Sequence, residues 1–420
     1  MNKHLKDLLI NFHSKGRRYS YYPSLPDWSG DLDKEFIIDG LDLEEINLYI
    51  HIPYCPSLCT FCGCNIKITK AKNQFRSYIN KIIEEWNTYK LKNPKISLSS
   101  IYLGGGTPTY LELEDIKHLL GSIFDGTEVS PDFIGTLETD PRIEQSKKLE
   151  YLRSVGFNSI SIGVQDTHKD TLLNVNRDQS FEQVKDLVNH SRDLGFDEIN
   201  LDIIYGLPFQ TEETFKETIE DIVSLSPDRI ANYPLAKVPW QMDLQNALGL
   251  YKPLGTYEMY DLYIQSDEML KDAGYNLLGM GHYSNKGIKY NRDITGYTRA
   301  KKTSLIALGT SGISNTRDYL YQNDKILEKY IAFPNAAIKT HKKSNREKTL
   351  EILFAQINCE GRLRKETLNT CFEENQIEKL SKNIKIFKNY DILVEDSDSY
   401  TTTAFGKHFN KTICQTIESI

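Results

Sequence analysis

The sequence has no hydrophobic run long enough to span a membrane. A span needs about 18 consecutive apolar residues, and the apolar segment 46–54 of this 420-residue chain already contains a proline and is followed by Cys55. The basic start, residues 1–7, is followed by neither a long apolar run nor a small-residue cleavage site. We therefore expect no secretory signal and a cytoplasmic location.

Positive charge is not in excess, and glycine and proline are not abundant. The chain has 51 Lys and Arg against 58 Asp and Glu, a formal net charge of −7, which argues against a nucleic-acid partner held by broad electrostatics. A local basic pocket for a small anion remains open. With 39% hydrophobic residues, 25 glycines and 14 prolines, the composition is that of a globular protein, not of a disordered or collagen-like chain.

Short apolar or β-branched runs alternate with segments that have helical periodicity. This alternation predicts a parallel sheet with right-handed crossovers, which curves into a complete or partial (β/α) barrel. An open doubly wound sheet is the alternative. The expected strands cover residues 47–53, 100–103, 133–137, 159–164, 198–204 and 228–235, and the expected helices cover 75–91, 111–123, 146–155, 181–194 and 213–225.

The pattern changes toward both ends of the chain. Residues 1–45 include an aromatic and basic segment without helical period, and we expect an ordered arm over the active site. Residues 46–330 are expected to form the barrel with an extension after residue 239. Residues 331–420 are helical again and predict a smaller, mostly helical C-terminal domain that resembles a helix-rich or winged-helix module.

Polar residues and glycines follow the expected strands. Because the carboxyl ends of parallel strands meet at one edge of a sheet, these residues mark a ligand site there, although glycine and polar residues also simply end strands. They are the cysteine-containing loop after Ile52, the glycines 104–106, Glu138, Gln165 and Asp202.

Four of the seven cysteines fall within residues 55–64, which indicates metal chemistry and not a disulfide framework. The spacing of Cys55, Cys59 and Cys62 is C-x3-C-x2-C. Three thiolates on one loop suit a [4Fe–4S] cluster with one open iron. A structural zinc site, the alternative, usually has two separated C-x2-C pairs.

This loop after a first strand, followed by the glycines 104–106, resembles the radical S-adenosylmethionine (SAM) superfamily. Within it, the chain is similar to the oxygen-independent coproporphyrinogen III oxidases, and Cys64 favours them over related haem-insertion proteins. The motifs that carry this similarity lie at residues 62–65, 104–109, 138–142, 163–166, 175–177 and 202–208, with shorter matches at 18–23, 296–298 and 412–414.

The resemblance implies oxidative decarboxylation of two propionates of coproporphyrinogen III to vinyl groups by a 5′-deoxyadenosyl radical. It also implies a tetrapyrrole substrate, an external electron donor such as a flavodoxin or ferredoxin, and a monomer. It assigns the cluster to Cys55, Cys59 and Cys62; a first SAM to Tyr49, Gly105, Glu138 and Ile313; and a second SAM to Phe61, Gly106, Thr107, Gln165, Arg177, Asp202 and Ala236.

Several roles stay open at this point. Tyr49 and Cys64 are the candidate catalytic residues, although Cys64 is equally well explained by burial alone. His51 is expected to be structural. Arg17 and Arg18 would either meet substrate carboxylates or remain solvated. Gly281 stands where the family usually has Asp, which keeps open a methyl-transferring or haem-degrading relative. A haem-binding chaperone is a further alternative, against which Cys64 and the motif of the N-terminal arm argue.

Overall fold

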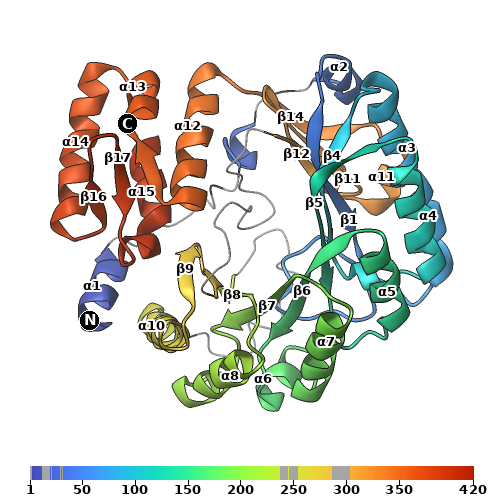
Figure 1. The fold of residues 1–420 in the computed structure, drawn as a ribbon, viewed down its shortest axis with the longest axis horizontal. Helices are drawn as coiled ribbons and strands as arrows, with labels where there is room; N and C mark the ends of the chain where they lie inside the picture. Colours follow the sequence, from blue (N-terminus) through green and yellow to red (C-terminus); the bar gives the residue numbers. More distant parts are fainter. Residues whose placement is uncertain are drawn as a thin grey trace. The chain divides into compact units, whose positions relative to one another are not determined.

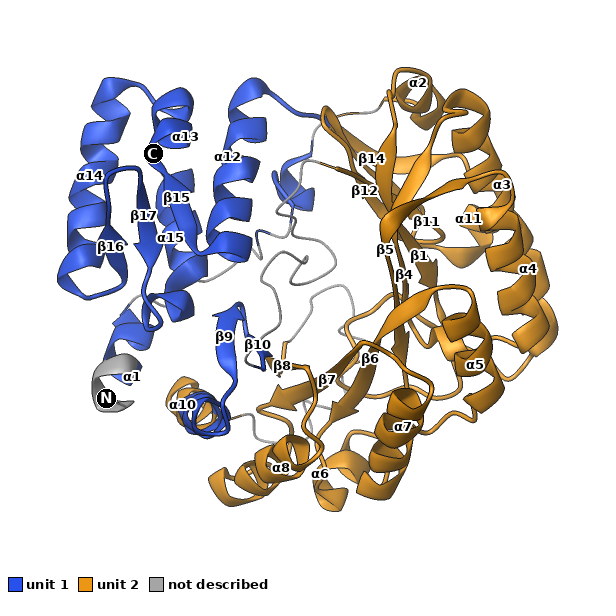
Figure 2. Ribbon diagram, viewed as in Figure 1, with its two compact units in different colours: residues 1–28, 263–302, 342–420 blue, residues 29–262, 303–341 orange. Residues whose placement is uncertain are grey.

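The computed structural model describes residues 2–11, 19, 21–28, 30, 32–236, 245, 254–285 and 303–420. No helix in these ranges is both long and apolar enough to cross a membrane. Arg17, Arg18 and the motif at 296–298 lie outside the described residues. The chain divides into two compact units: unit 1 with residues 1–28, 263–302 and 342–420, and unit 2 with residues 29–262 and 303–341 (Figure 2). The predicted boundaries after residues 45 and 330 stay predictions.

Unit 2 contains a curved sheet of parallel strands (Figure 1). The strands pair in the order β11-β1-β4-β5-β6-β7-β8, and every pair in this series is parallel. The six strands expected from the sequence are all present. Their bounds are β1 (Glu45–Ile52), β4 (Ser97–Gly105), β5 (Glu128–Thr139), β6 (Phe157–Gln165), β7 (Glu198–Tyr205) and β8 (Arg229–Pro234), and β11 spans Ser304–Leu308.

Three antiparallel strands extend this sheet beyond β11: β12 (Ile313–Asn315), β13 (Tyr319–Asn323) and β14 (Ala337–Lys342). Within the described chain, no further strand follows β14 in this sheet. The sheet is therefore a partial barrel, and the predicted α/β fold class is confirmed.

Helices cover the outer face of the curved sheet, as the βαβ alternation requires (Figure 1). Two of them, α7 and α8, begin at capping boxes in which Ser180 and Thr211 accept from backbone N–H groups of the first turn. The helices of unit 2 are α2 (Lys34–Asp39), α3 (Phe75–Lys92), α4 (Leu113–Phe124), α5 (Ser146–Ser154), α6 (Lys169–Asn174), α7 (Phe181–Asp193), α8 (Glu212–Ser224) and α11 (Leu327–Ala332). Helix α10 (Thr256–Asp272) crosses the division between the units.

The core of unit 2 lies between the sheet and these helices. Strand residues such as Ile50, Leu137 and Ile160 are fully buried, and so is Trp86 on α3. Parallel strands covered on both faces give continuous apolar runs in the sequence, which is why they could be recognised.

Unit 1 combines helices with short antiparallel strands. Its helices are α1 (Asn2–Asn11), α12 (Asn345–Ala355), α13 (Lys365–Cys371), α14 (Glu374–Asn389) and α15 (Asn410–Glu418). A three-stranded sheet has the order β15 (Arg362–Arg364), β17 (Ser399–Thr402), β16 (Leu393–Glu395). Strands β9 (Asn276–Gly279) and β10 (His282–Ser284) form an antiparallel pair.

The aromatic segment near the start of the chain packs within unit 1. The Tyr19 hydroxyl donates to Glu418 on α15 at 2.5 Å, and the Tyr19 ring meets Phe354 on α12 edge-on at 4.8 Å. Trp28 is buried and donates to the Pro23 carbonyl at 2.9 Å. Helices α1 and α2 within residues 1–45 were not predicted. The position of this arm over the active site stays a prediction.

The turn between β9 and β10 explains the glycine at position 281. Gly279, Met280 and Gly281 have φ values of +140°, +54° and +81°. Such left-handed backbone is adopted most readily by glycine. The residue that departs from the family pattern therefore has a conformational reason of its own.

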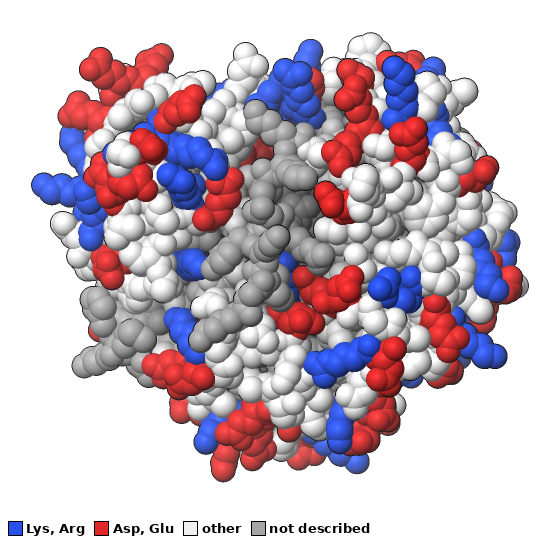
Figure 3. Space-filling view, in the orientation of Figure 1, with Lys and Arg blue, Asp and Glu red and all other residues white. Residues whose placement is uncertain are grey.

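Acidic and basic side chains are interspersed over the described surface shown in Figure 3. This mixture agrees with the small net charge of −7 on 420 residues.

Candidate active site

The predicted site residues on β1, β4, β5, β6 and β7 lie toward the carboxyl ends of these strands in unit 2. Pairing places Ile52, the last residue of β1, beside Gly105, the last residue of β4. Glu138 pairs with Ser161, and Gly163 pairs with Asp202. The parallel register therefore places the carboxyl ends of β1, β4, β5, β6 and β7 side by side. A ligand site at strand ends requires this arrangement.

The cysteine loop is fixed against the turn that follows β4. Gly106 N–H donates to the Ile52 carbonyl at 2.8 Å, and Thr107 N–H donates to the Tyr54 carbonyl at 2.9 Å. The short strand β2 (Tyr54–Cys55) also pairs with β3 (Lys67–Ile68), so both sides of the loop are anchored. Cys55 Sγ lies 3.4 Å from the hydroxyl of Thr107.

The glycines of this turn stand where a side chain would clash with neighbouring protein atoms. A Cβ on Gly106 would lie 2.9 Å from Cys55 Sγ and 2.8 Å from the Tyr54 carbonyl oxygen. Gly105 has a φ of +114°, and a Cβ there would lie 2.7 Å from the His51 ring. Only glycine fits both positions without displacing neighbours, so the turn packs closely against the cysteine loop and the His51 ring.

The other end of the cysteine loop is held by the turn between α6 and α7. The Val175 carbonyl accepts from Thr60 N–H at 3.1 Å, and the Asn176 side chain donates to the Leu58 carbonyl at 2.5 Å. Asn176 adopts a φ of +57°. This turn and the cysteine loop are thus fixed to each other by one backbone and one side-chain hydrogen bond.

Cys59 is buried beside two guanidinium groups. Arg142 Nη2 donates to Cys59 Sγ at 3.5 Å, and Arg177 Nη1 donates to the same atom at 3.6 Å. Asp140 accepts from both arginines, at 2.6 Å and 3.2 Å respectively. Burial alone would raise the pKa of Asp140, but Arg177 and Arg142 hold it below its usual value. Arg142 and Asp140 were not among the predicted site residues, although they lie in the motif 138–142.

Arg177 is almost fully buried, and each of its guanidinium nitrogens contacts protein. Besides Cys59 and Asp140, Nε donates to Gln179 at 2.9 Å and Nη2 donates to the Gly163 carbonyl. Its predicted contact with the second SAM stays a prediction.

Two partly buried carboxyl groups lie along the strand ends. Burial raises the pKa of Glu138 to about 7, although Gly105 N–H and the Tyr102 hydroxyl each donate to it at 2.9 Å. Burial also raises the pKa of Asp202 to about 6, although Asn200 and Ser161 donate to it. A cationic or hydroxyl-bearing ligand would stabilise the ionised form of both carboxyl groups.

Gln165 stands at an irregular point of β6. Its φ is +73°, and the register of β6 with β7 shifts between Gly163 and Gln165. A Cβ on Gly163 would lie 2.7 Å from Gln165 Nε2. A non-glycine residue in left-handed backbone at a strand end is typical of functional sites.

His51 and Tyr49 are linked on β1. The Tyr49 hydroxyl lies 3.0 Å from His51 Nδ1, and His51 Nε2 lies 2.8 Å from the Asn65 carbonyl. Burial lowers the pKa of His51 to about 4, so the ring is neutral and Nε2–H donates to Asn65. His51 thus fixes the chain just after Cys64.

Phe61 and Ala236 are joined by Gln245, which the sequence did not indicate. Gln245 Nε2 donates to the Phe61 carbonyl at 2.9 Å and to the Ala236 carbonyl at 3.0 Å. Phe61 also packs against buried Val175 and Leu207. Ile313 begins β12 and pairs with Gln322.

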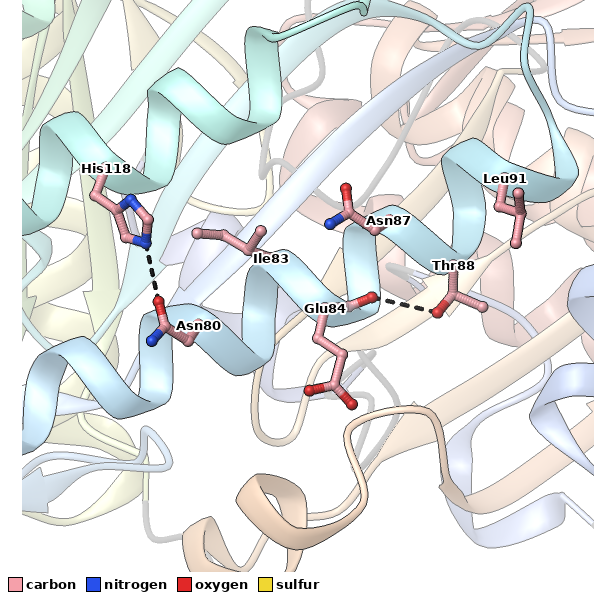
Figure 4. A pocket seen from close by; sticks show the side chains of 7 residues that line it. All are labelled: Asn80, Ile83, Glu84, Asn87, Thr88, Leu91 and His118. Atoms are coloured by element: carbon pink, nitrogen blue, oxygen red, sulfur yellow. Dashed lines mark hydrogen bonds between the residues drawn. The ribbon is translucent and has the colours of Figure 1, made fainter.

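A separate surface groove lies between α3 and α4, on the outer side of unit 2 (Figure 4). It is lined by Asn80, Ile83, Glu84, Asn87, Thr88, Leu91 and His118. His118 Nε2 lies 2.9 Å from Asn80 Oδ1. None of the predicted site residues lines this groove.

Comparison with known proteins identifies the family of this chain. The family model of the radical SAM superfamily matches residues 49–222. An oxygen-independent coproporphyrinogen III oxidase from Salmonella typhimurium is 32% identical over 336 residues, which cover 77% of this chain and 73% of the relative. One from Cereibacter sphaeroides is 27% identical and covers 97% of this chain and 95% of the relative.

A solved structure has the same fold over almost the whole chain. The coproporphyrinogen III oxidase of Escherichia coli, described as a radical SAM enzyme, superposes with a TM-score of 0.86 at 27% identity, covering 96% of this chain and 97% of that one. The fold and the cysteine loop are those of a radical SAM enzyme. Within that class, this chain belongs to the family of oxygen-independent coproporphyrinogen III oxidases.

Membership in this family implies a [4Fe–4S] cluster and SAM, and the cysteine loop fits that cluster. Burial raises the pKa of Cys55 to about 12, so its thiolate needs a positive partner such as iron. A hydrogen bond from Cys64 lowers the pKa of Cys62 and raises that of Cys64. Among the described residues, no three His, Cys, Asp or Glu side chains converge on a single-ion site. Thiolates that each bind a different iron of a cube stand further apart.

Proposed function

We propose that this protein converts two propionate side chains of coproporphyrinogen III to vinyl groups without oxygen, giving protoporphyrinogen IX. The observation that carries the proposal is the cysteine loop, fixed against the glycine turn of β4 at the strand ends of a fold shared with these oxidases. In each decarboxylation one hydrogen atom leaves the β-carbon, carbon dioxide leaves the carboxylate, and one electron passes to an acceptor.

The cofactors supply the radical chemistry, and the chain supplies binding and shielding. When bound, the cluster and SAM provide a 5′-deoxyadenosyl radical that removes the hydrogen atom. Cys55, Cys59 and Cys62 would hold the cluster, and the glycine turn at 104–107 would present its backbone groups to SAM. The strands and helices around this edge keep water from the reacting groups.

The site residues divide between two SAM molecules in this proposal. The first SAM contacts Tyr49, Gly105, Glu138 and Ile313. The second contacts Phe61, Gly106, Thr107, Gln165, Arg177, Asp202 and Ala236. Support comes from the register that aligns Glu138 and Asp202 at one edge, and from the Gln245 side chain that joins Phe61 to Ala236.

Tyr49 and Cys64 are the proposed catalytic residues. Tyr49 is buried, and its hydroxyl is oriented by neutral His51. Cys64 is exposed, which suits a thiol that contacts a large substrate at the open side of the cluster loop.

The proposal includes the setting of the reaction. An external one-electron donor such as a flavodoxin or ferredoxin reduces the cluster. The protein acts as a monomer in the cytoplasm.

The proposed function is tested by incubating reconstituted protein anaerobically with dithionite, SAM and coproporphyrinogen III. Mass analysis should show stepwise loss of two carboxyl groups together with 5′-deoxyadenosine. Deoxyadenosine without decarboxylation would keep the radical enzyme and reject this substrate. Replacing Cys55, Cys59 or Cys62 by Ala should abolish both cluster absorbance and SAM cleavage, and retention of either would reject the ligand assignment.

A further inference from the structure

A compact charged set surrounds the sulfur of Cys59. It consists of Arg142, Asp140 and Arg177, whose side chains are 14%, 9% and 5% exposed. Two positive groups and one negative group leave one net positive charge next to the thiol. Because the set is nearly buried, solvent and salt screen this charge weakly.

The geometry of the set is fixed by contacts on every side. Asp140 Oδ2 lies between the two guanidinium groups, and Arg142 Nη1 also reaches the Ser57 hydroxyl at 3.5 Å. The Asp140 backbone carbonyl accepts from Gln145 at 3.1 Å. The two N–H donors aimed at Cys59 are therefore preorganised.

We propose that Arg142, held by Asp140 and acting together with Arg177, raises the reduction potential of the cluster through Cys59. Hydrogen bonds to a ligand sulfur and nearby positive charge both stabilise the more negative, reduced cluster. The step is the transfer of one electron from an external low-potential donor to the cluster, without proton transfer. Arg142 acts on that step as a positioning residue, and it is distinct from the SAM-binding residues proposed above.

This inference rests on the proposed ligand role of Cys59. It adds to the ligand role of Cys59 a residue that acts on the cluster. The motif 138–142 contains both Glu138, proposed to contact the first SAM, and Arg142, proposed to act on the cluster. Glu138 is the second-last residue of β5 and Arg142 lies on the loop after it, and Arg142 turns back to the cysteine loop through Asp140.

The test is a redox titration of the reconstituted protein, without SAM or tetrapyrrole. Dithionite and low-potential viologen dyes set the potential, and electron paramagnetic resonance measures the reduced cluster. Arg142→Gln should shift the midpoint to a more negative value, and Arg142→Lys should recover part of the shift. Asp140→Asn should shift the midpoint the opposite way, because it removes the negative charge from the set.

The matched control is Arg76→Gln. Arg76 pairs with Asp115 at 2.7 Å on the helix surface, so its loss should leave the midpoint unchanged. An intact cluster with the wild-type midpoint in Arg142→Gln would overturn the proposal, as would shifts of the same sign in Arg142→Gln and Asp140→Asn. Loss of the cluster in Arg142→Gln, Arg142→Lys and Asp140→Asn would also overturn the proposal, because the charged set would then serve cluster assembly. A wild-type protein that binds no iron and sulfide would instead reject the proposed function itself.

Discussion

Lys34 on α2 and Glu85 on α3 form an ion pair in which both side chains are fully buried. Lys34 also donates to Asn323 at 2.7 Å and to the Pro334 carbonyl at 3.2 Å. Glu85 accepts from the Tyr330 hydroxyl at 2.6 Å and from Gly309 N–H at 3.0 Å. The pair thus ties the two helices to the segment from β11 to α11.

Breaking this pair should be costly. Lys34→Met leaves a buried carboxylate without its cation, and we expect unfolding free energy to fall by about 3–5 kcal/mol. Urea unfolding monitored by circular dichroism measures the change. The control Lys81→Met removes a partly exposed pair with Glu84 and should cost less than about 1 kcal/mol. Equal losses in the two variants would contradict the buried role of Lys34.

The raised pKa of Glu138 predicts a pH dependence of stability in the cluster-free protein. Between the ordinary value of 4.5 and about 7, the carboxyl is ionised in the unfolded chain but protonated in the folded one. Wild-type stability should therefore fall as pH rises through this window, by up to about 1.4 kcal/mol per pH unit.

Substitution separates this contribution from other groups. Glu138→Gln should remove that part of the dependence of unfolding free energy on pH. The control Glu114→Gln, at an exposed position of α4, should keep the wild-type dependence. Denaturant midpoints at half-unit pH steps provide the measurement. Identical slopes in wild type and Glu138→Gln would show that Glu138 titrates normally.

Gly106 should not tolerate a side chain. A methyl group there meets Cys55 Sγ and the Tyr54 carbonyl, so Gly106→Ala should cost roughly 1–3 kcal/mol and lower iron and sulfide content after reconstitution. Gly121 on α4 has open space around it, and Gly121→Ala should instead gain roughly 0.5–1 kcal/mol. Full cluster content in Gly106→Ala would contradict the tight packing of the two loops.

The side chain of Gln165 should be needed for turnover, although its left-handed backbone lowers the stability of the protein. Its left-handed backbone costs about 1–2 kcal/mol in any residue with a Cβ, so Gln165→Gly should be more stable than Gln165→Ala by about that amount. Both variants should keep the cluster absorbance and lose turnover, because both lack the amide proposed to bind the second SAM. Full turnover in either variant would argue against that role.

Much of unit 2 could be predicted because buried parallel strands and amphipathic helices leave clear periods. Strands β12, β13 and β14 were not predicted from the sequence. They are only three to six residues long, and such short strands show little periodicity. Helices α1 and α2 were missed beside an aromatic segment that has no helical period.

The site shows the same limit. Cysteine spacing and successive glycines mark the cluster loop and its turn, because both depend on the local chain. Gln245 and Arg142 could not be recognised, since each gains its role by reaching a loop more than 80 residues away. Only the folded backbone brings such side chains to their partners.

The pairing of β1 has a consequence for the order in which the protein matures. Strand β1 carries the cysteine loop and lies between β4 and β11, yet Ser304, the partner of Ile46, emerges from the ribosome only after most of the chain has been made. Until then β1 is an edge strand, and exposed edges invite pairing with other chains. Cluster insertion into a finished sheet must therefore follow synthesis of residues 304–308, and premature release of the nascent chain would leave the cofactor loop on an open edge.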